Sequence, residues 1–290
     1  MNMTTTAEIR RPRDDERDLF GLTHIGKVRK ENQDHFLICT VHSQVTVDAT
    51  SLASADQLDL RGRRLATMGL VADGVGGSDS GSDASRLAAE TVMKYVTSTL
   101  RSYHAAGSSN DDVFMKSLTD AVYQAHDVVR AEGATRGEPK PMATTLTLVV
   151  AVWPWMYVVQ VGDSRCYYFD GQTFTQVTKD QTIAQHLVDS GALPKERLAS
   201  SPLRHVLSSV IGGEEAMPHV SRVDMRRSGC MLMCSDGLTG HVTNEELEAH
   251  VRSMTSCKQL CETLLQLALE RGGKDNITIV AGRAPLPKAI

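Results

Sequence analysis

Short runs of apolar residues, most of them bounded by glycine or by polar turns, dominate the middle of the chain. Such runs are typical of β-strands. Strands are predicted at His35–Val41, Met68–Ala72, Thr144–Trp153, Met156–Val161, Arg165–Phe169, Gln172–Val177, Val220–Met225, Met231–Cys234 and Ile277–Ala281. The turns at 153–155 and 170–171 are too short for a crossover helix, so the strands that they join are expected to be antiparallel.

Apolar residues at helical spacing form two pairs of further segments. Ser85–Leu100 carries one apolar face, and the pattern repeats in the next segment from Leu118 to Val129. Near the C-terminus, Thr243 and Glu246 have the spacing of a capping box, and a second apolar stripe, Leu260–Ala268, ends before a glycine pair. Antiparallel strands with two helical pairs predict two sheets packed face to face, with helices on the outer faces.

Few features divide the chain into domains. Residues 1–17 are polar and lack apolar periodicity, so we expect a flexible tail followed by one domain over residues 18–286. No repeat and no low-complexity linker interrupts that domain. The segment 41–64 is rich in Ser, Thr and Asp, and it is interpreted as a polar insertion or a long hairpin.

The charge balance restricts the class of partner. The 290 residues include 31 Lys and Arg and 35 Asp and Glu, which gives a formal net charge of −4. This mild acidity and the 4% aromatic content argue against nucleic acid, because phosphates are held by clustered cations and bases stack on aromatic rings. Six cysteines are too few for a disulfide scaffold, no apolar segment follows Met1, and no apolar stretch reaches the roughly 20 residues of a membrane span. We therefore expect a cytoplasmic protein without membrane contact.

Acidic residues stand at the ends of the apolar runs. Asp73, Asp163 and Asp236 each follow a run and have glycine as a neighbour. Asp275 precedes the last run, and Asp34 precedes the first. Antiparallel pairing could bring these ends to one rim of the sheets, where five carboxylates would repel one another unless cations lay between them.

This set of carboxylates favours a metal centre. Oxygen ligands suit Mg²⁺ and Mn²⁺, and a glycine after the aspartate lets a backbone carbonyl join them. One Asp-Gly pair is more often a turn than a ligand, but five acidic residues in the same context favour a metal cluster. The ten histidines lack the spacing of a zinc site. Cys230, Cys234, Cys257 and Cys261 lie on apolar stretches, so they are interpreted as core residues rather than zinc or redox groups.

Six blocks of sequence contain these acidic residues or lie between them. They are Arg29–Asp34, Val71–Gly77, Met142–Thr145, Val161–Arg165, Cys234–Leu238 and Gly273–Thr278. In this order they resemble the metal-dependent Ser/Thr protein phosphatases of type 2C, in their bacterial form, over residues 20 to about 282. The resemblance implies an α+β fold, a four-layer α-β-β-α sandwich of two antiparallel sheets flanked by helical pairs. It also implies a binuclear metal centre in a cleft at one end, with residues 180–213 as a flap beside it.

The resemblance implies a metal role for five residues. Asp73 bridges two Mn²⁺ or Mg²⁺ ions, and the Gly74 carbonyl binds one of them. Asp236 and Asp275 complete the ligands of the other ion. Asp163, together with Asp236, holds a third, weaker ion.

Three more residues have implied roles beside the metals. Arg29 grips the substrate phosphate, for which a planar and permanently charged fork is suited. Asp34 holds a metal-bound water. Asn276 orients Asp275 or a metal-bound water.

These features predict a metal-dependent protein serine/threonine phosphatase that hydrolyses phosphoserine and phosphothreonine. A hydroxide that bridges the two metals attacks phosphorus in line, while the metals and Arg29 neutralise charge on the phosphoryl oxygens. The expected partners are phosphorylated proteins, among them a bacterial Ser/Thr kinase and its substrates, and the protein is expected to be a monomer. Two other functions stay open: a phosphate-binding regulatory module without turnover, and a metal phosphohydrolase of small molecules.

One position departs from the family's pattern. Many bacterial relatives have His directly after Asp-Gly-x-Gly-Gly, and this chain has Ser78 there. The group that protonates the leaving alkoxide is therefore left open.

Overall fold

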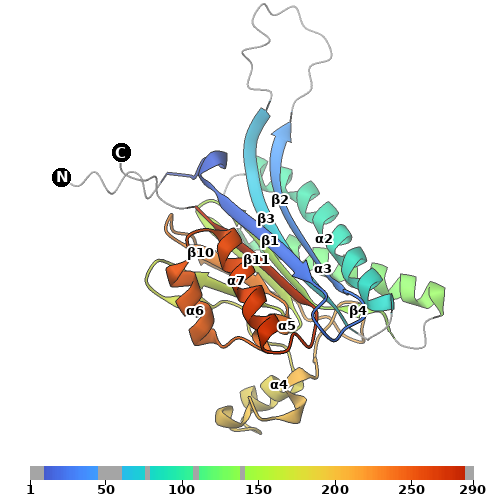
Figure 1. Ribbon diagram of the computed structural model, residues 1–290. Helices are drawn as coiled ribbons and strands as arrows, with labels where there is room; N and C mark the ends of the chain where they lie inside the picture. The colour runs from blue at the N-terminus through green and yellow to red at the C-terminus, as the bar shows by residue number, and fades with distance from the viewer. Residues whose placement is uncertain (1–9, 45–60, 76–78, 107–110, 138–140, 285–290) are drawn as a thin grey trace, which may run out of the picture.

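Two antiparallel sheets pack face to face between two layers of helices (Figure 1). The computed structural model describes residues 10–44, 61–75, 79–106, 111–137 and 141–284. In the described residues one sheet has the strand order β1-β11-β10-β7-β8, and the other has the order β2-β3-β5-β6-β9 with β4 paired to β3. This arrangement confirms the expected α+β sandwich of four α-β-β-α layers.

The first sheet is covered by helices from the C-terminal part of the chain. Its strands are β1 (Asp18–His24), β7 (Arg165–Phe169), β8 (Phe174–Gln176), β10 (Cys230–Cys234) and β11 (Ile277–Arg283), and its helices are α5 (Asp236–Thr239), α6 (Asn244–Ser253) and α7 (Cys257–Glu270). The predicted capping box opens α6: the Thr243 side chain accepts from the Glu246 backbone, and the Glu246 side chain accepts in return. Four cysteines are buried free thiols in this layer, as expected for core residues: Cys230, Cys234, Cys257 and Cys261.

The second sheet is covered by two long helices. Its strands are β2 (Asp34–Gln44), β3 (Arg61–Val75), β4 (Ala143–Thr144), β5 (Leu146–Val152), β6 (Trp155–Val161) and β9 (His219–Asp224), and its helices are α2 (Asp79–Ala106) and α3 (Asp111–Arg136). Val92 and Val96 of α2 and Leu118 and Val122 of α3 pack into one buried cluster with this sheet. A third apolar cluster lies between the two sheets, with Val71, Val149, Met233 and Val280 among its members.

A separate excursion projects from one end of the sandwich. It contains α4 (Ile183–Asp189) and the 3₁₀ turns η3 (Lys195–Arg197) and η4 (Pro202–His205), at the bottom of Figure 1. These elements fall within residues 180–213, which we call the flap. Within the described ranges, no helix is long and apolar enough to cross a membrane.

The N-terminal region differs from the expectation in two ways. Strand β1 was not predicted, because Gly21 interrupts its apolar residues; no side chain fits there, since a Cβ would lie 2.7 Å from the Phe36 ring. The flexible tail was expected to reach residue 17, and this is wrong for residues 10–17. The short helix η1 (Asp14–Glu16) packs on the sandwich, where Glu16 pairs with the buried Arg227 at 3.1 Å. A segment that is held by ion pairs has no apolar periodicity, so the sequence pattern did not indicate that it packs on the domain.

The segment 41–64 is described only at its two ends. Strands β2 and β3 pair from Asp34 and Asp73 out to Gln44 and Arg61, with two register shifts near the far end. The described ends therefore form a long hairpin. Residues 45–60 lie outside the described residues, as do Ser78 and the two glycines before it.

Candidate active site

Five aspartates lie within electrostatic reach of one another, and four of them line one cleft together with residues of the flap, which projects from one end of the sandwich (Figure 1). Asp34 begins β2 directly opposite Asp73 in the register of β3. Asp163 follows β6, Asp236 begins α5, and Asp275 precedes β11. Burial, and then the charges of the other four carboxylates, raise the pKa of Asp73 well above its usual range. The structure thus brings together all five acidic residues that the sequence singled out.

The backbone of Asp73 is fixed by the two threonines at the start of the β4–β5 segment. The Asp73 carbonyl accepts from the Thr145 N–H at 2.8 Å and from the Thr144 hydroxyl at 2.9 Å. The Asp73 N–H donates to the Thr145 hydroxyl at 3.2 Å. Beside it, a Cβ on Gly74 would lie only 2.3 Å from the Gly81 carbonyl oxygen, so only glycine fits. The sequence assigned no role to these threonines, and hydroxyl–backbone bonds of this kind have no signature in spacing.

Asp34 is 3% exposed and is held by two hydroxyls. The Ser235 and Thr278 hydroxyls each donate to its Oδ2 at 2.7 Å. Its Oδ1 is buried and has no hydrogen-bond partner. Burial raises the pKa of Asp34 to about 6, against the opposing effect of the two hydroxyls. A buried carboxylate oxygen without a donor fits the expected role of holding a water that a metal binds.

Asp236 and Asp275 are neighbours because α5 packs tightly on the turn before β11. A Cβ on Gly237 would lie 1.9 Å from the Asn276 carbonyl oxygen, so α5 can approach this closely only through glycine. Burial, and then the charge of Asp275, raise the pKa of Asp236, while the charges of His205 and Arg29 oppose that shift.

Asp163 lies at the side of the cleft nearest the flap. Burial, followed by the charges of Asp236 and Asp180, raises its pKa to about 8. Asp180 is itself paired with Arg165 through two bonds of 2.8 and 2.6 Å. The position beside Asp236 agrees with a shared ion, as the resemblance implies.

Arg29 is paired with one of the expected metal ligands. Its Nε donates to Asp275 Oδ1 at 2.7 Å, and its Nη2 donates to Asp275 Oδ2 at 2.6 Å. The Arg29 side chain is 48% exposed, so its guanidinium is accessible from the cleft.

Asn276 uses its side chain differently from the expectation. Its Oδ1 accepts from the Gln33 N–H, and its Nδ2 donates to the carbonyls of Ile25 and Glu31. Its backbone N–H, not its amide, donates to Asp275 Oδ1 at 2.8 Å. The amide therefore positions the 25–33 loop that carries Arg29, while the main chain orients Asp275.

The residues present fit divalent cations. The donor set consists of carboxylate and carbonyl oxygens, which Mn²⁺ and Mg²⁺ prefer. Burial, and after it the charges of neighbouring carboxylates, raise the pKa values of Asp34, Asp73, Asp163 and Asp236, and divalent cations would offset both effects. In the described part of the chain no three acidic, His or Cys side chains already converge in ligand geometry. Asp275 is instead turned to Arg29.

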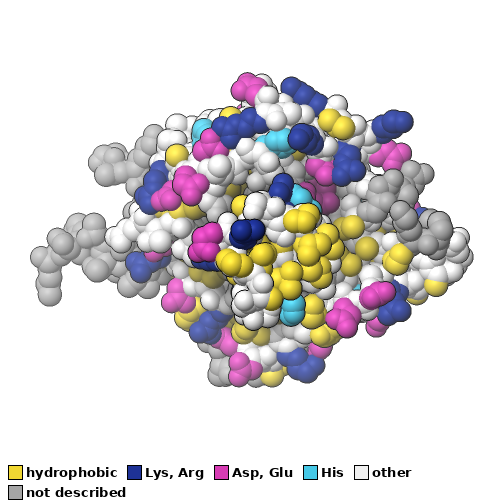
Figure 2. Space-filling view, turned by 90° about the horizontal axis from the view of Figure 1, so that it is seen from below, with side chains coloured by type: hydrophobic (Ala, Val, Ile, Leu, Met, Phe, Trp, Pro, Cys, Tyr) yellow, Lys and Arg dark blue, Asp and Glu magenta, His cyan; other side chains and the backbone are white. Residues whose placement is uncertain are grey.

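Basic side chains surround the acidic cleft, and the sequence analysis assigned a role at the site only to Arg29 among them. The lining includes Arg29, Arg165, Lys195, Arg204, His205, Arg271 and Lys274. Lys195, Arg204 and His205 belong to the flap. Figure 2 views this end of the molecule, and it shows Lys, Arg and His side chains beside apolar ones near the middle of the face. The tertiary fold brings these residues together from distant parts of the chain. Arg29, Arg165 and Lys274 lie in the sequence blocks named above, whereas Lys195, Arg204, His205 and Arg271 lie outside them.

Comparison with known proteins supports one family. A profile of the protein phosphatase 2C family matches residues 43–270. The serine/threonine protein phosphatase PstP of Mycobacterium tuberculosis is 30% identical over 210 residues, which are 72% of this chain but only 39% of PstP. The chain therefore spans about two fifths of that relative's length. The protein phosphatase PhpP of Streptococcus pneumoniae is 27% identical over 260 residues, which are 89% of this chain and 94% of PhpP.

Solved structures of PstP have the same fold. A crystal structure of the M. tuberculosis phosphatase covers 93% of this chain and 99% of its own, with a TM-score of 0.73 and 26% identity. A structure of the PstP catalytic domain in complex with two manganese ions covers 93% and 98%, with a TM-score of 0.70 and 24% identity.

Proposed function

The chain belongs to the protein phosphatase 2C family, and from this premise we propose that it is a metal-dependent phosphatase of phosphoserine and phosphothreonine in proteins. The observation that carries the proposal is that Asp73, Asp163, Asp236 and Asp275 line one cleft together with arginines and lysines, with the buried Asp34 beside Asp73. Clustered carboxylates bind divalent cations, and the surrounding arginine and lysine side chains attract a phosphate dianion.

The metal ligands are assigned residue by residue. Asp73 and the Gly74 carbonyl serve the two Mn²⁺ or Mg²⁺ ions together with Asp236 and Asp275, and Asp163 shares a third, weaker ion with Asp236. The manganese-bound PstP structure supports two such ions in this fold. When bound, the two ions would supply the nucleophile for phosphoryl transfer, because divalent cations lower the pKa of a coordinated water.

The chain's own residues bind and orient the substrate. Arg29 leaves Asp275 and presents its fork to the phosphoryl oxygens, whose geometry it matches as well as that of a carboxylate. Asp34 accepts a hydrogen bond from the attacking water through its free Oδ1. Asn276 holds the loop that carries Arg29.

Phosphorylated proteins are the proposed partners, including a bacterial Ser/Thr kinase and its substrates. The cleft supports this choice, because flap residues Lys195, Arg204 and His205 line it together with the aspartates. A polypeptide around the phosphorylated side chain can contact all three. We further propose a cytoplasmic monomer, as expected for a protein that reverses kinase action there.

Hydrolysis of a phosphothreonine peptide in the presence of Mn²⁺ tests this function. We expect turnover that is abolished by EDTA and lost in Asp73→Asn. A chain that binds Mn²⁺ and the phosphopeptide but releases no phosphate would be a binding module instead. Turnover of small phosphate esters but not of phosphopeptides would indicate a small-molecule phosphohydrolase.

A further inference from the structure

A second cavity lies between the two sheets and shares no lining residue with the acidic cleft. Its volume is about 110 Å³. Small residues leave this space where the strands face each other: Gly69 on β3, Ala151 on β5 and Gly282 on β11. Met156 and Met231 also line it, with flexible and polarisable side chains that adapt to different shapes. An apolar cavity of this size accommodates a small hydrocarbon group.

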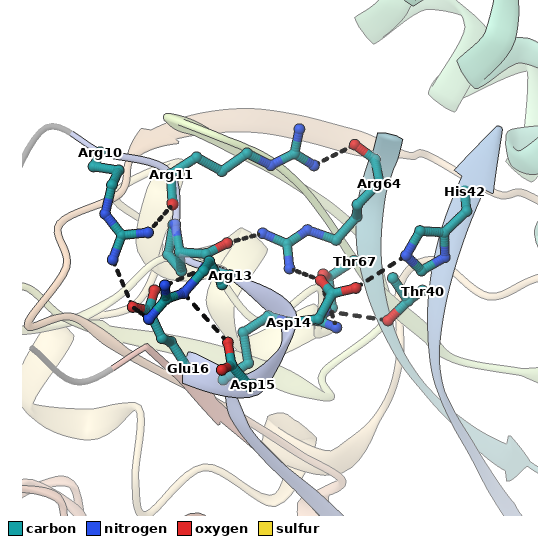
Figure 3. Close-up of polar contacts among 12 residues, drawn as sticks. Arg10, Arg11, Arg13, Asp14, Asp15, Glu16, Thr40, His42, Arg64 and Thr67 are labelled. Atoms are coloured by element: carbon teal, nitrogen blue, oxygen red, sulfur yellow. Dashed lines mark hydrogen bonds and ion pairs between the residues drawn. The ribbon is translucent and has the colours of Figure 1, made fainter. Parts of the chain in front are cut away.

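The charged part of the lining has one sign. Five arginines contribute to it, and no Asp or Glu does among the described residues: Arg11, Arg17, Arg64, Arg226 and Arg283. Three of these arginines are paired with carboxylates that stand outside the lining. Asp14 is shared between Arg17 and Arg64, and Asp18 pairs with Arg283. Figure 3 shows Arg64 and Thr67 beside Asp14, with Arg11 next to them.

Arg17 has one buried N–H donor without a hydrogen-bond partner. Its Nη1 donates to the hydroxyls of Thr40 and Thr67 at 3.1 and 2.6 Å, and its Nη2 lies 3.2 Å from Asp14. Its Nε is buried and has no hydrogen-bond partner. Burial, and then the charge of Arg64, lower the pKa of Arg17, and the charge of Asp14 opposes this shift only in part. An anion beside Nε would satisfy the donor and offset both effects.

We propose that this inter-sheet cavity binds a small monocarboxylate, with its hydrocarbon body between Gly69, Ala151 and Gly282 and its carboxylate at Arg17. A carboxylate matches the planar guanidinium fork, and a body of roughly four to six carbons matches the cavity's size. The apolar lining selects the body, and the all-arginine charge selects the head group. This site is independent of phosphate-ester hydrolysis, so its test does not depend on turnover.

Calorimetric titration of the full chain with three six-carbon probes tests the proposal. Hexanoate has the body and the anionic head, 1-hexanol lacks the charge, and hexylamine carries the opposite charge. We expect hexanoate to bind at least tenfold more tightly than 1-hexanol, and hexylamine not to bind. Equal affinity for hexanoate and 1-hexanol would overturn the role of the arginines, and no binding of hexanoate would overturn the site. If hexanoate bound only to a chain shortened by residues 285–290, the chain itself would be the occupant and the proposal would be wrong.

Two variants locate the binding. Gly69→Ala adds a methyl group whose nearest heavy atom would be 3.5 Å away, so it is accommodated while it takes up cavity space. We expect it to weaken hexanoate binding at least fivefold, whereas Gly133→Ala on α3 leaves binding unchanged. Arg17→Gln is expected to weaken hexanoate at least fivefold without affecting 1-hexanol, with Arg252→Gln on α6 as its control. Hexanoate affinity that is unchanged in Gly69→Ala would place the ligand elsewhere, even if Arg17→Gln failed to fold.

Discussion

Arg29 and Asp275 form a two-bond ion pair at the mouth of the acidic cleft, with distances of 2.7 and 2.6 Å. The first residue is proposed to bind the substrate phosphate, and the second is proposed to bind a metal. In this structure Arg29 therefore occupies the position expected for a metal at Asp275, and Asp275 occupies the position expected for the phosphate at Arg29. Loading the centre with Mn²⁺ must compete with Arg29 for Asp275, and the released guanidinium is then free for phosphate.

Replacement of Arg29 separates these two roles. Arg29→Ala is expected to raise KM for a phosphopeptide by about 10- to 100-fold, the effect of losing one charge-assisted contact worth about 1.5–3 kcal/mol. Mn²⁺ affinity should be equal or slightly higher, because Asp275 loses its competitor. Steady-state kinetics and calorimetric Mn²⁺ titration measure both quantities. Arg252→Ala is the control, and a parallel loss of Mn²⁺ binding would show that Arg29 supports the ligands instead.

Asn276 is expected to act on the phosphate contact from a distance. Asn276→Ala removes three hydrogen bonds to the 25–33 loop, so we expect a loss of about 2–4 kcal/mol in the free energy of unfolding. KM should rise as in Arg29→Ala, because the loop no longer fixes Arg29. Asn244→Ala, which loses one bond to Tyr167, is the matched control. A stable Asn276→Ala variant with normal KM but weakened Mn²⁺ binding would assign Asn276 to the metal.

The charge of Asp236 is expected to be required for turnover when metal is bound, and to lower the thermal stability of the metal-free protein. Asp236→Asn should lower kcat by about 10²-fold or more, since a ligand of two ions is weakened. The metal-free variant should unfold at an equal or higher temperature than the parent, because burial and Asp275 raise the pKa of Asp236 and disfavour its ionised form. Thermal unfolding in EDTA measures this, with the exposed Asp127→Asn as control. Near-normal turnover would mean that Asp236 is not a ligand.

Burial of the carboxyl groups, together with their mutual repulsion, predicts an unusual pH dependence for the metal-free protein. The pKa of Asp34 is raised to about 6 and that of Asp163 to about 8. Between the unfolded value near 4 and these values the folded chain holds more protons, so the free energy of unfolding falls as pH rises. We expect a loss on the order of 5 kcal/mol between pH 5 and 8. Urea unfolding in EDTA should show this decline, and saturating Mn²⁺ should abolish it. Stability that is flat in EDTA would mean that the pKa values of Asp34 and Asp163 are not raised in the folded protein.

The sequence predicted those features that depend on residues close to one another in the chain. Each proposed ligand lies at the end of an apolar run, and the glycines beside Asp73 and Asp236 are required by contacts of 2.3 and 1.9 Å. The short apolar runs of the strands and the Thr243 capping box are likewise set by nearby residues. The two-sheet sandwich followed from these local patterns together with the short turns between strands.

The rest depends on contacts between distant residues. The pair of Glu16 and Arg227 spans 211 positions, and it holds a segment that looks like a flexible tail in the sequence. The Ser235 and Thr278 hydroxyls that hold Asp34 are common residue types without a distinctive spacing. Residue patterns identify the groups that carry charge, but not the hydroxyls, amides and flap cations that position or surround them.

Asp163 tests whether the third ion is a separate site. Its place beside Asp236, near the flap, gives it no contact with Arg29 or Asn276 among its main interactions, and its pKa is raised chiefly by burial and by Asp236. Asp163→Asn should therefore remove a weak class of Mn²⁺ sites while leaving the tighter class within about twofold. Asp275→Asn should do the reverse, because Asp275 serves the main centre. Calorimetric titration over a wide Mn²⁺ range separates the two classes, and phosphopeptide turnover shows which class the reaction needs. Loss of both classes in Asp163→Asn would mean that the carboxylates form one indivisible cluster, since a single missing charge would then disturb every ion in it.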